Sequence, residues 1–455
     1  MAQRAVEGKR VSVIGAARSG RAIAALLKRR GATVFVSDKA PADRMQEAVE
    51  EFRALSIPAE FGRNSDKILD ADLVVVSPGV PSDLPILGAA QARGITVASE
   101  LEVASWFCRG TIVGITGTNG KTTTTTLTGK LLEDAEIPTA VGGNIGTAFS
   151  QIVESVERDT AVVLEVSSFQ LDYCIDFRPQ VSVLLNITPD HLDRYGHSFD
   201  RYGDAKARIF AKQKKGDTLI YNLDDTETTR QVNGKAPQEV RRLPFSVEQH
   251  LDQGAWVENG HLIINVDGKR SDVLPVAGIG IPGIHNLANA MAATLAATVM
   301  GAPPSSVART LERFKGVEHR LEFVREIRGV RYINDSKATN VDSVWYALQS
   351  FERPIVLILG GRDKGNDYTR LHELVKNRVR AIVAIGESAG KVVKAFAGVR
   401  AVDTADNMED AVDLCMRRAQ PGDIVLLSPA CASFDWFENY EHRGRVFKKI
   451  VTGLE

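Results

Sequence analysis

A glycine-rich segment in the first third of the chain constrains the fold more than any other feature. The segment Gly114-Ile-Thr-Gly-Thr-Asn-Gly-Lys-Thr-Thr123 follows a short apolar run at 111–113 and precedes a threonine-rich stretch with a helical pattern. A strand, a glycine-rich turn and a helix start, in this order, point backbone N–H groups and a helix dipole at an anion. Lys121 would reach the β- and γ-phosphates of a nucleotide, and the Thr122 hydroxyl is a hard ligand for Mg²⁺. The segment predicts a nucleotide phosphate site, although Ile115 stands where the usual pattern has glycine.

Length and charge limit the class of protein. A chain of 455 residues is too long for one core, and ordinary domain sizes suggest about three domains. The 56 basic residues nearly cancel the 57 acidic ones, so no overall field favours nucleic acid or an anionic membrane. We therefore expect small-molecule partners, no nucleic acid and no membrane, and we expect a monomer.

The cysteines and the apolar runs indicate a compartment. The four cysteines are far apart and include no Cys-x-x-Cys pair, so neither a disulfide framework nor a zinc site is indicated. The N-terminus lacks an apolar signal core, and no later run approaches the ~20 apolar residues of a membrane span. These features predict a soluble protein in the reducing cytoplasm.

The first predicted domain, 1–101, opens with a βαβ pattern. A strand at 10–15 leads into Gly15-Ala-Ala-Arg-Ser-Gly20, a helical pattern and a second strand at 33–38. This is a Rossmann-like opening, but Ala17 replaces the glycine that lets a pyrophosphate approach most closely, so an NAD site is not expected. Asp38 could accept hydrogen bonds from a ribose or sugar, or could be a solvated turn residue. A third strand, 72–77, runs into a Pro-Gly loop at the sheet edge where ligands usually bind.

The second predicted domain, 102–316, carries three candidate metal ligands besides Thr122. Glu165 lies within an apolar strand pattern, and a buried carboxylate needs a partner, for which Mg²⁺ is favoured over a structural ion pair. His191 follows another strand in a polar turn, which favours a functional histidine over a core one. Lys206 lies in a helical pattern that, taken alone, indicates a surface lysine.

Three further features complete this domain. Asn144 lies in a glycine-rich loop, where it could bind a ligand. From 217 to 280, short strand signals alternate with turn signals and predict a β-rich excursion. Asn286 and Asn289 share one face of an alanine-rich helix, where they could read a base edge or cap the helix.

The third predicted domain, 317–455, repeats the α/β pattern. Apolar strands at 355–359, 381–385 and 424–427 are separated by helical stretches, which predicts a second doubly wound, Rossmann-like sheet. Polar loops follow all three strands, at 360–365, 386–388 and 428–435, and the first two contain glycine.

Several motifs together resemble the Mur ligases of peptidoglycan precursor synthesis, over essentially the whole chain. They are Gly117-Thr-Asn-Gly-Lys-Thr122, Glu165-Val-Ser-Ser-Phe-Gln170, Asp190-His-Leu-Asp193, His319-Arg320, Asn334-Asp-Ser-Lys-Ala-Thr-Asn340 and Ser428-Pro-Ala-Cys-Ala-Ser433. Within the family, Asp335–Thr339, Asp363–Gly365 and Ser433–Asp435 resemble the branch that adds D-glutamate. The Asp-Asn-Pro-Arg signature of the branches that add diaminopimelate or lysine is absent. Tyr440 stands where a phenylalanine is expected, which leaves its glutamate contact open.

The resemblance implies three α/β domains around a central P-loop-type ATPase with a mostly parallel sheet. It implies ATP and two Mg²⁺ ions as cofactors, with UDP-N-acetylmuramoyl-L-alanine and D-glutamate as substrates and an acyl phosphate as intermediate. It also reverses the surface assignment of Lys206, because that position matches a lysine that the family carbamylates, and a carbamate offers anionic oxygens to metal.

The resemblance also assigns roles to residues. The nucleotide would contact Gly117, Thr118, Asn119, Gly120, Lys121, Thr122, Thr123, Asn286, Asn289, Arg320 and Asp335. Thr122 and Glu165 would hold the first metal, and Glu165, His191 and carbamylated Lys206 the second, so that Lys121, His191 and Lys206 carry the catalysis. The substrates would contact Arg18, Ser19, Asp38, Ser77, Gly79, Asn144, Lys337, Thr339, Lys364, Ser433 and Phe434.

Two other functions are compatible with part of the pattern. A folylpolyglutamate synthase also uses Gly-Thr-Asn-Gly-Lys, but would not be expected to carry a separate domain before it. A nucleotide-switch binding module would use ATP without ligation, but does not need the metal ligands Glu165, His191 and Lys206.

Overall fold

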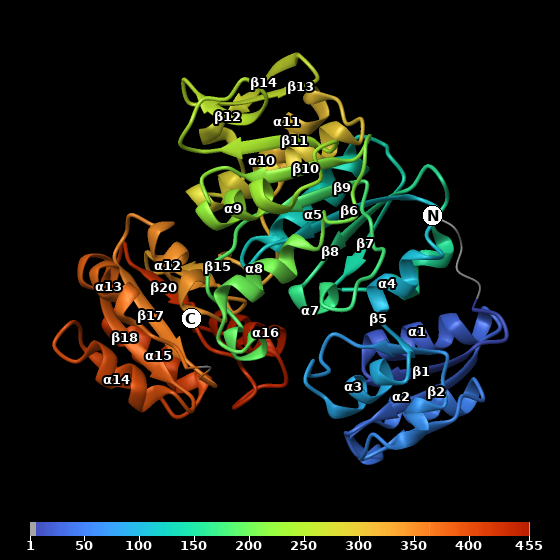
Figure 1. The fold of residues 1–455 in the computed structure, drawn as a ribbon. Coiled ribbons are helices and arrows are strands. Elements are labelled where there is room, and N and C mark those ends of the chain that lie inside the picture. Colours follow the sequence, from blue (N-terminus) through green and yellow to red (C-terminus); the bar gives the residue numbers. More distant parts are fainter. Residues whose placement is uncertain (1–5, 145, 364, 455) are drawn as a thin grey trace. The chain divides into compact units, whose positions relative to one another are not determined.

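The computed structural model describes residues 6–144, 146–363 and 365–454 and contains three β-sheets that follow one another along the chain (Figure 1). The described residues form two compact units. One contains the chain up to Gly278 together with Ala288–Glu312, and the other contains Ile279–Leu287 together with the chain from Arg313 onward. The first two sheets belong to the first unit and the third sheet to the second unit. The three-domain α/β prediction is confirmed, while its boundaries at 101 and 316 stay a prediction.

The first sheet is wholly parallel, with strand order β3-β2-β1-β4-β5. The central strand β4 is apolar and buried at every position, as expected where helices cover a parallel sheet on both faces. The strands are β1 (Arg10–Ile14), β2 (Thr33–Asp38), β3 (Ala59–Phe61), β4 (Leu73–Val76) and β5 (Thr96–Ser99), and the helices are α1 (Arg18–Arg29), α2 (Gln46–Ala54), α3 (Pro85–Ala92) and α4 (Glu100–Ser105). The predicted βαβ opening is therefore present, and the loops after β1, β2 and β4 leave the same edge of the sheet.

The second sheet has nine strands in the order β14-β13-β12-β11-β10-β9-β6-β8-β7. Strands β6 to β12 pair in parallel, and β12, β13 and β14 pair antiparallel. Its strands are β6 (Thr111–Thr116), β7 (Thr139–Gly143), β8 (Ala161–Glu165), β9 (Val181–Leu184), β10 (Thr218–Asn222), β11 (Arg241–Ser246), β12 (Gly254–Glu258), β13 (His261–Val266) and β14 (Lys269–Pro275). Its helices are α5 (Lys121–Asp134), α6 (Phe149–Ile152), α7 (Ser168–Leu171), α8 (Phe199–Ala207) and α9 (Thr226–Lys235). The phosphate loop leaves β6, which lies between β8 and β9.

The segment 217–280 is β-rich, as the sequence predicts, and contains the five strands β10 to β14. Its strands extend the second sheet, and it contains the helix α9, which the turn signals concealed. The side chain of Asp225 caps this helix by accepting a hydrogen bond from the backbone N–H of Thr228 at 2.7 Å. The polar residue types that cap helices also form turns, so the local sequence does not distinguish the start of α9 from a turn.

The third sheet has six strands in the order β15-β16-β20-β17-β18-β19, and only the edge strand β15 is antiparallel. The strands are β15 (Glu322–Ile327), β16 (Val330–Asn334), β17 (Ile355–Gly360), β18 (Val379–Ile385), β19 (Val402–Thr404) and β20 (Ile424–Leu427). Its helices are α12 (Val341–Gln349), α13 (His372–Arg378), α14 (Ala389–Phe396), α15 (Met408–Arg418) and α16 (Tyr440–Thr452). The helices α10 (Ile284–Val299) and α11 (Pro304–Arg313) precede this sheet in the chain, but most of their residues belong to the first unit. Within the described ranges, no helix combines the length and the apolar character that crossing a membrane requires.

Candidate active site

The phosphate loop lies between β6 and α5, as the sequence predicts. Gly120 has a left-handed backbone (φ 84°), and a Cβ atom there would lie 2.2 Å from Oδ1 of Asn289, so only glycine fits. Ile115 is fully buried within β6, which accounts for the departure from the usual pattern: the loop begins only after Thr116. The backbone N–H of Asn119 donates to Oδ1 of Asn186 at 2.8 Å, which fixes the loop against the end of β9. The loop thus leads directly into a helix of 14 residues.

Two lysines meet at this loop. Lys121 Nζ donates hydrogen bonds to the carbonyl oxygens of Gly117 and Thr118, both at 2.8 Å. Lys206 Nζ, from α8, donates to the same carbonyl of Gly117 at 2.7 Å and lies 4.6 Å from the centre of the Tyr202 ring. Lys206 is only 1% exposed, so the surface position indicated by its helical pattern is wrong and the active-site position is supported. Burial, and next the charge of Lys121, hold the pKa of Lys206 well below its ordinary value.

A carboxylate lies next to the start of α5. Glu165, at the end of β8, is buried; its Oε2 accepts a hydrogen bond from Thr122 Oγ1 and its Oε1 accepts one from Asn144 Nδ2, both at 2.8 Å. The structure thus brings together three predicted ligand-binding residues that are far apart in the sequence. A hydroxyl and a carboxylate side by side are the hard oxygen donors that Mg²⁺ prefers.

His191 lies in the loop after β9 and has a left-handed backbone (φ 52°), which is uncommon for a residue other than glycine. Its backbone N–H donates to Oδ1 of Asp190 at 2.9 Å, and its ring lies edge-on to the Phe169 ring at 5.0 Å. The side chain is 38% exposed, and its Nε2 lies 3.7 Å from Oδ2 of Asp190. Its role as a metal ligand stays a prediction.

The donor set fits a nucleotide phosphate and a hard cation. The loop has glycine where a side chain would fill the cradle, Lys121 supplies positive charge, and Thr122 and Glu165 supply oxygen donors. The buried hydroxyl of Thr123 has no hydrogen-bond partner within the described part of the chain.

Most of the residues predicted to bind the uridine substrate lie at one edge of the first sheet. Asp38 accepts hydrogen bonds from the backbone N–H groups of Ala16 at 2.6 Å and Ala40 at 2.7 Å, so it anchors the loop after β1. Ser77 Oγ donates to the carbonyl of Gly15 at 3.2 Å. Arg18 Nη2 donates to the carbonyl of Asn144 at 3.3 Å, which joins two predicted substrate residues. Arg18 and Ser19 are the first two residues of α1, and Gly79 lies in the loop after β4 with open space at its Cβ position.

The residues predicted to bind the adenine and ribose of ATP form hydrogen bonds within the protein. Asn289 accepts a hydrogen bond from Thr124 Oγ1 at 3.3 Å, while Asn286 Nδ2 donates to the carbonyl of Pro282 at 2.7 Å near the start of α10. Asp335 is buried, and its two oxygens accept hydrogen bonds from Ser428 Oγ at 2.8 Å and from the Leu321 N–H at 3.2 Å. Burial raises the pKa of Asp335 to about 6, although the charge of Arg320 acts in the opposite direction.

Four of the residues predicted to bind D-glutamate lie in loops that follow strands of the third sheet: Lys337, Thr339, Ser433 and Phe434. Lys337 Nζ donates to the Tyr440 hydroxyl at 3.3 Å and lies over the Tyr440 ring, 5.1 Å from its centre. Ser433 is buried, Thr339 is half-buried, and Phe434 is 61% exposed. Lys364 lies outside the described residues.

Sequence reasoning missed Arg443, which joins two of these loops. This arginine of α16 is 1% exposed; it donates to the hydroxyl and carbonyl oxygens of Ser336, at 2.9 and 2.7 Å, and to the carbonyl of Cys431 at 3.1 Å. Burial lowers its pKa to about 10. Arg443 therefore supports both the Lys337 loop and the Ser433 loop. A cation inside an amphipathic helix usually faces solvent, so the pattern carried no signal.

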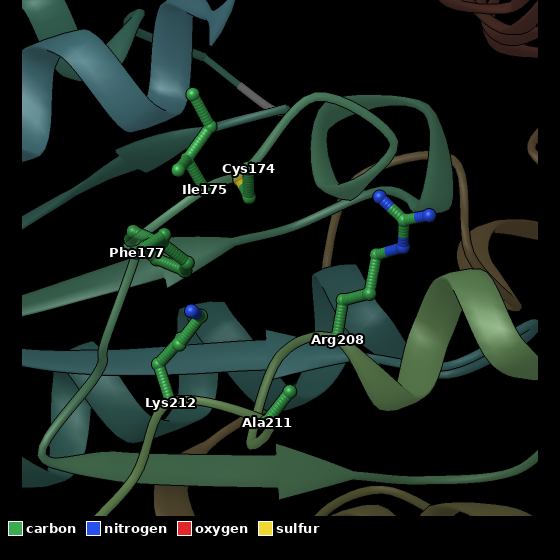
Figure 2. Close-up of a pocket in the computed structure, with 6 residues that line it drawn as sticks. All are labelled: Cys174, Ile175, Phe177, Arg208, Ala211 and Lys212. Atoms are coloured by element: carbon green, nitrogen blue, oxygen red, sulfur yellow. The ribbon is translucent and has the colours of Figure 1, made fainter.

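A small cavity of about 190 Å³ lies beside the end of α8 (Figure 2). It is lined by Cys174, Ile175, Phe177, Arg208, Ala211 and Lys212, and none of these is a predicted site residue. It is smaller than the roughly 300–1,000 Å³ typical of pockets for drug-sized ligands.

Comparison with known proteins identifies three matching domain families along the chain. They are the Mur ligase MurD-like N-terminal domain over residues 9–99, the Mur ligase middle domain over 115–297 and the Mur ligase glutamate ligase domain over 319–431.

Curated relatives match over the full length. A UDP-N-acetylmuramoylalanine–D-glutamate ligase of Salinibacter ruber is 49% identical, with 99% of both chains covered. One from Chloroherpeton thalassium is 45% identical, with 100% of both chains covered. Among solved structures, UDP-N-acetylmuramate-alanine ligase of Thermotoga maritima has a TM-score of 0.62 at 19% identity, covering 98% of this chain and 99% of its own, which shows a shared fold.

Proposed function

The chain belongs to the Mur ligase family, and we propose that it is an ATP-dependent ligase that adds D-glutamate to UDP-N-acetylmuramoyl-L-alanine in peptidoglycan precursor synthesis. The observation that carries the substrate assignment is the 49% identity, over 99% of both chains, to a relative with that name. The phosphate loop, with Lys121 and Lys206 on one carbonyl oxygen, supports the ATP-dependent chemistry.

The reaction begins with two anions that must meet. A carboxylate is a poor acyl donor, because its negative charge repels a nucleophile and it lacks a good leaving group. The L-alanyl carboxylate therefore first attacks the γ-phosphate of ATP and forms an acyl phosphate with release of ADP. Lys121 and the N–H groups at the start of α5 lower the repulsion, because fixed positive charge at the transferring phosphate stabilises the transition state. The amine of D-glutamate then attacks the acyl carbon, phosphate leaves, and an amide bond remains.

We assign two Mg²⁺ ions to the oxygen donors of this site. Thr122 and Glu165 would hold the first ion, and Glu165, His191 and a carbamate on Lys206 the second. When bound, the ions would supply further positive charge at the phosphates.

The carbamate forms when the neutral Lys206 amine attacks CO₂, with loss of one proton. The burial of Lys206 and the neighbouring charge of Lys121 favour the neutral amine that this addition requires.

The remaining residues bind and orient. Arg18, Ser19, Asp38, Ser77, Gly79 and Asn144 would contact the uridine substrate, while Asn286, Asn289, Arg320 and Asp335 would contact ATP. Lys337, Thr339, Lys364, Ser433 and Phe434 would contact D-glutamate, whose two carboxylates suit cations and hydroxyls. We further propose that the protein acts in the cytoplasm as a monomer.

One assay tests the assignment against its rivals. ADP release is measured with ATP, Mg²⁺ and UDP-N-acetylmuramoyl-L-alanine against D-glutamate, L-glutamate, D-aspartate, L-lysine and diaminopimelate, and separately with a reduced folate and L-glutamate. Release only with D-glutamate is expected. Turnover with the folate would establish the folylpolyglutamate alternative. ATP hydrolysis at the same rate with and without the uridine substrate and the amino acid would establish a nucleotide switch.

A further inference from the structure

A nearly buried arginine connects three segments around the candidate active site. The side chain of Arg194 is 11% exposed and follows the His191 turn. Its Nη1 donates to the carbonyl of Val80 at 3.0 Å, and its Nε donates to Oδ2 of Asp172 at 3.1 Å. Val80 belongs to the loop after β4, which contains the predicted substrate residue Gly79. Arg194 thus ties this loop to the second sheet.

The same guanidinium also supports His191. Its central carbon lies 4.2 Å from the centre of the Phe169 ring, within the range of a cation–π contact. Phe169 in turn meets the ring of His191 at 5.0 Å. One ring therefore lies in contact with both Arg194 and His191.

Asp172 extends the connection to the helix that carries Lys206. Besides Arg194, the Asp172 carboxylate accepts a hydrogen bond from the Tyr195 hydroxyl at 3.3 Å, and the Asp172 carbonyl accepts one from Arg208 Nη1 at 2.6 Å. Arg208 is the C-cap residue of α8, two positions after Lys206. Figure 2 shows its side chain extending from the end of that helix toward the neighbouring loop.

We propose that Arg194 is a positioning residue that sets the loop of Val80 and the turn of His191 in one fixed arrangement. The expected effect of Arg194 on ligation rests on the proposed function, whereas its effect on the two segments does not. Three different groups surround the guanidinium: a carbonyl, a carboxylate and an aromatic ring. A planar, forked cation satisfies all three at once, and a lysine ammonium does not. Occupation of the substrate loop is thereby coupled to the placement of His191.

The test compares Arg194→Met and Arg194→Lys with a matched loop variant. Tyr173 Oη donates to the carbonyl of Ser82 at 3.1 Å, so Tyr173→Phe removes another contact to the same loop without touching Phe169. Both Arg194 variants are expected to raise the KM for the uridine substrate and to lower kcat by about 10²-fold, the scale of a misplaced catalytic geometry. Tyr173→Phe is expected to raise that KM only. Arg158 is exposed, so Arg158→Met serves as a control that should keep the KM and kcat of the unaltered protein.

Two further measurements separate positioning from general stability and from the proposed function. Added guanidinium is expected to restore part of kcat in Arg194→Ala, which a merely unfolded fraction would not do. Hydrogen exchange is expected to rise in Arg194→Met both at 78–83 and at 188–193. If either segment keeps the exchange of the unaltered protein, the inference is overturned, whatever reaction the enzyme performs. If exchange rises but no D-glutamate ligation occurs even in the unaltered protein, the proposed function is wrong and the positioning role stands.

Discussion

Lys121 and Lys206 donate hydrogen bonds from their Nζ atoms to one acceptor, the carbonyl oxygen of Gly117, at 2.8 and 2.7 Å. Two ammonium groups on one acceptor repel each other, and the burial of Lys206 adds a desolvation cost to its charge. The two lysines are therefore suited to different roles. Lys121 is suited to remain a cation at the phosphates, whereas Lys206 is suited to lose its proton and be modified.

Lys206→Arg is expected to be nearly inactive, because a guanidinium keeps its charge and does not form a carbamate. Lys206→Ala is expected to be equally slow but partly restored by short carboxylates, which replace the missing anion. The exposed Lys215→Arg serves as control. In the unaltered protein, ¹³C-labelled bicarbonate should give a carbamate signal by NMR that both Lys206 variants lack. Normal turnover by Lys206→Arg would exclude the carbamate.

Lys121→Ala is expected to lower kcat by about 10²–10³-fold or more, the scale of removing one group that stabilises developing charge. The thermal midpoint should change little, since Lys121 is not a core side chain. Lys130→Ala, half-exposed on the same helix and paired with Asp134, is the matched control and should keep normal turnover. Near-normal activity of Lys121→Ala would remove the central role given to the phosphate loop.

Glu165→Gln is expected to raise the Mg²⁺ concentration needed for half-maximal activity. The amide keeps the size of the side chain and still accepts a hydrogen bond from Thr122, but it loses the negative charge that a hard cation prefers. A Mg²⁺ titration of activity, with a thermal melt to verify folding, measures the change. An unchanged Mg²⁺ requirement would identify Glu165 as a structural partner of Asn144 and Thr122 instead of a metal ligand.

The sequence predicted the sheets because their central strands are apolar throughout. The predicted strands at 33–38 and 424–427 coincide with β2 and β20. Glu165 was predicted as a site residue because a buried carboxylate in an apolar strand needs a charged or polar partner. The helix α9 was missed because its cap resembles a turn.

Buried cationic side chains were the second feature that the sequence pattern did not predict. Lys206 follows Tyr202 by four residues, so the two share one face, and the Tyr202 ring covers the lysine. Its pattern indicates a surface position, and only the resemblance to a family suggested otherwise. Arg194 and Arg443 carried no signal at all, because their partners are backbone carbonyls and a carboxylate from distant segments. Such contacts depend on tertiary structure and are not encoded in local periodicity.

Asp335→Asn is expected to change how stability depends on pH. The folded protein holds the pKa of Asp335 at about 6, above its ordinary value of 3.8, so between these values the folded state binds more protons than the unfolded state. Stability should therefore fall as pH rises through this window in the unaltered protein, and the variant should lack this fall. The difference between the two thermal midpoints, followed from pH 4 to 7, measures it; a difference that is constant with pH would contradict the raised pKa.

Ser433→Ala and Lys337→Met are expected to raise the KM for D-glutamate far more than the KM for ATP or the uridine substrate. D-Glutamate has two carboxylates, and a hydroxyl and an ammonium are fitting donors for them. L-Glutamate should be a poor substrate, because holding both carboxylates in the same places turns its amine away from the acyl phosphate, a misplacement that could cost about 10²-fold in rate. Tyr440→Phe removes only the hydroxyl that accepts from Lys337, so it should change the D-glutamate KM less than Lys337→Met does. Equal rises for all three substrates would show that these residues maintain the fold of their loops and do not select the amino acid.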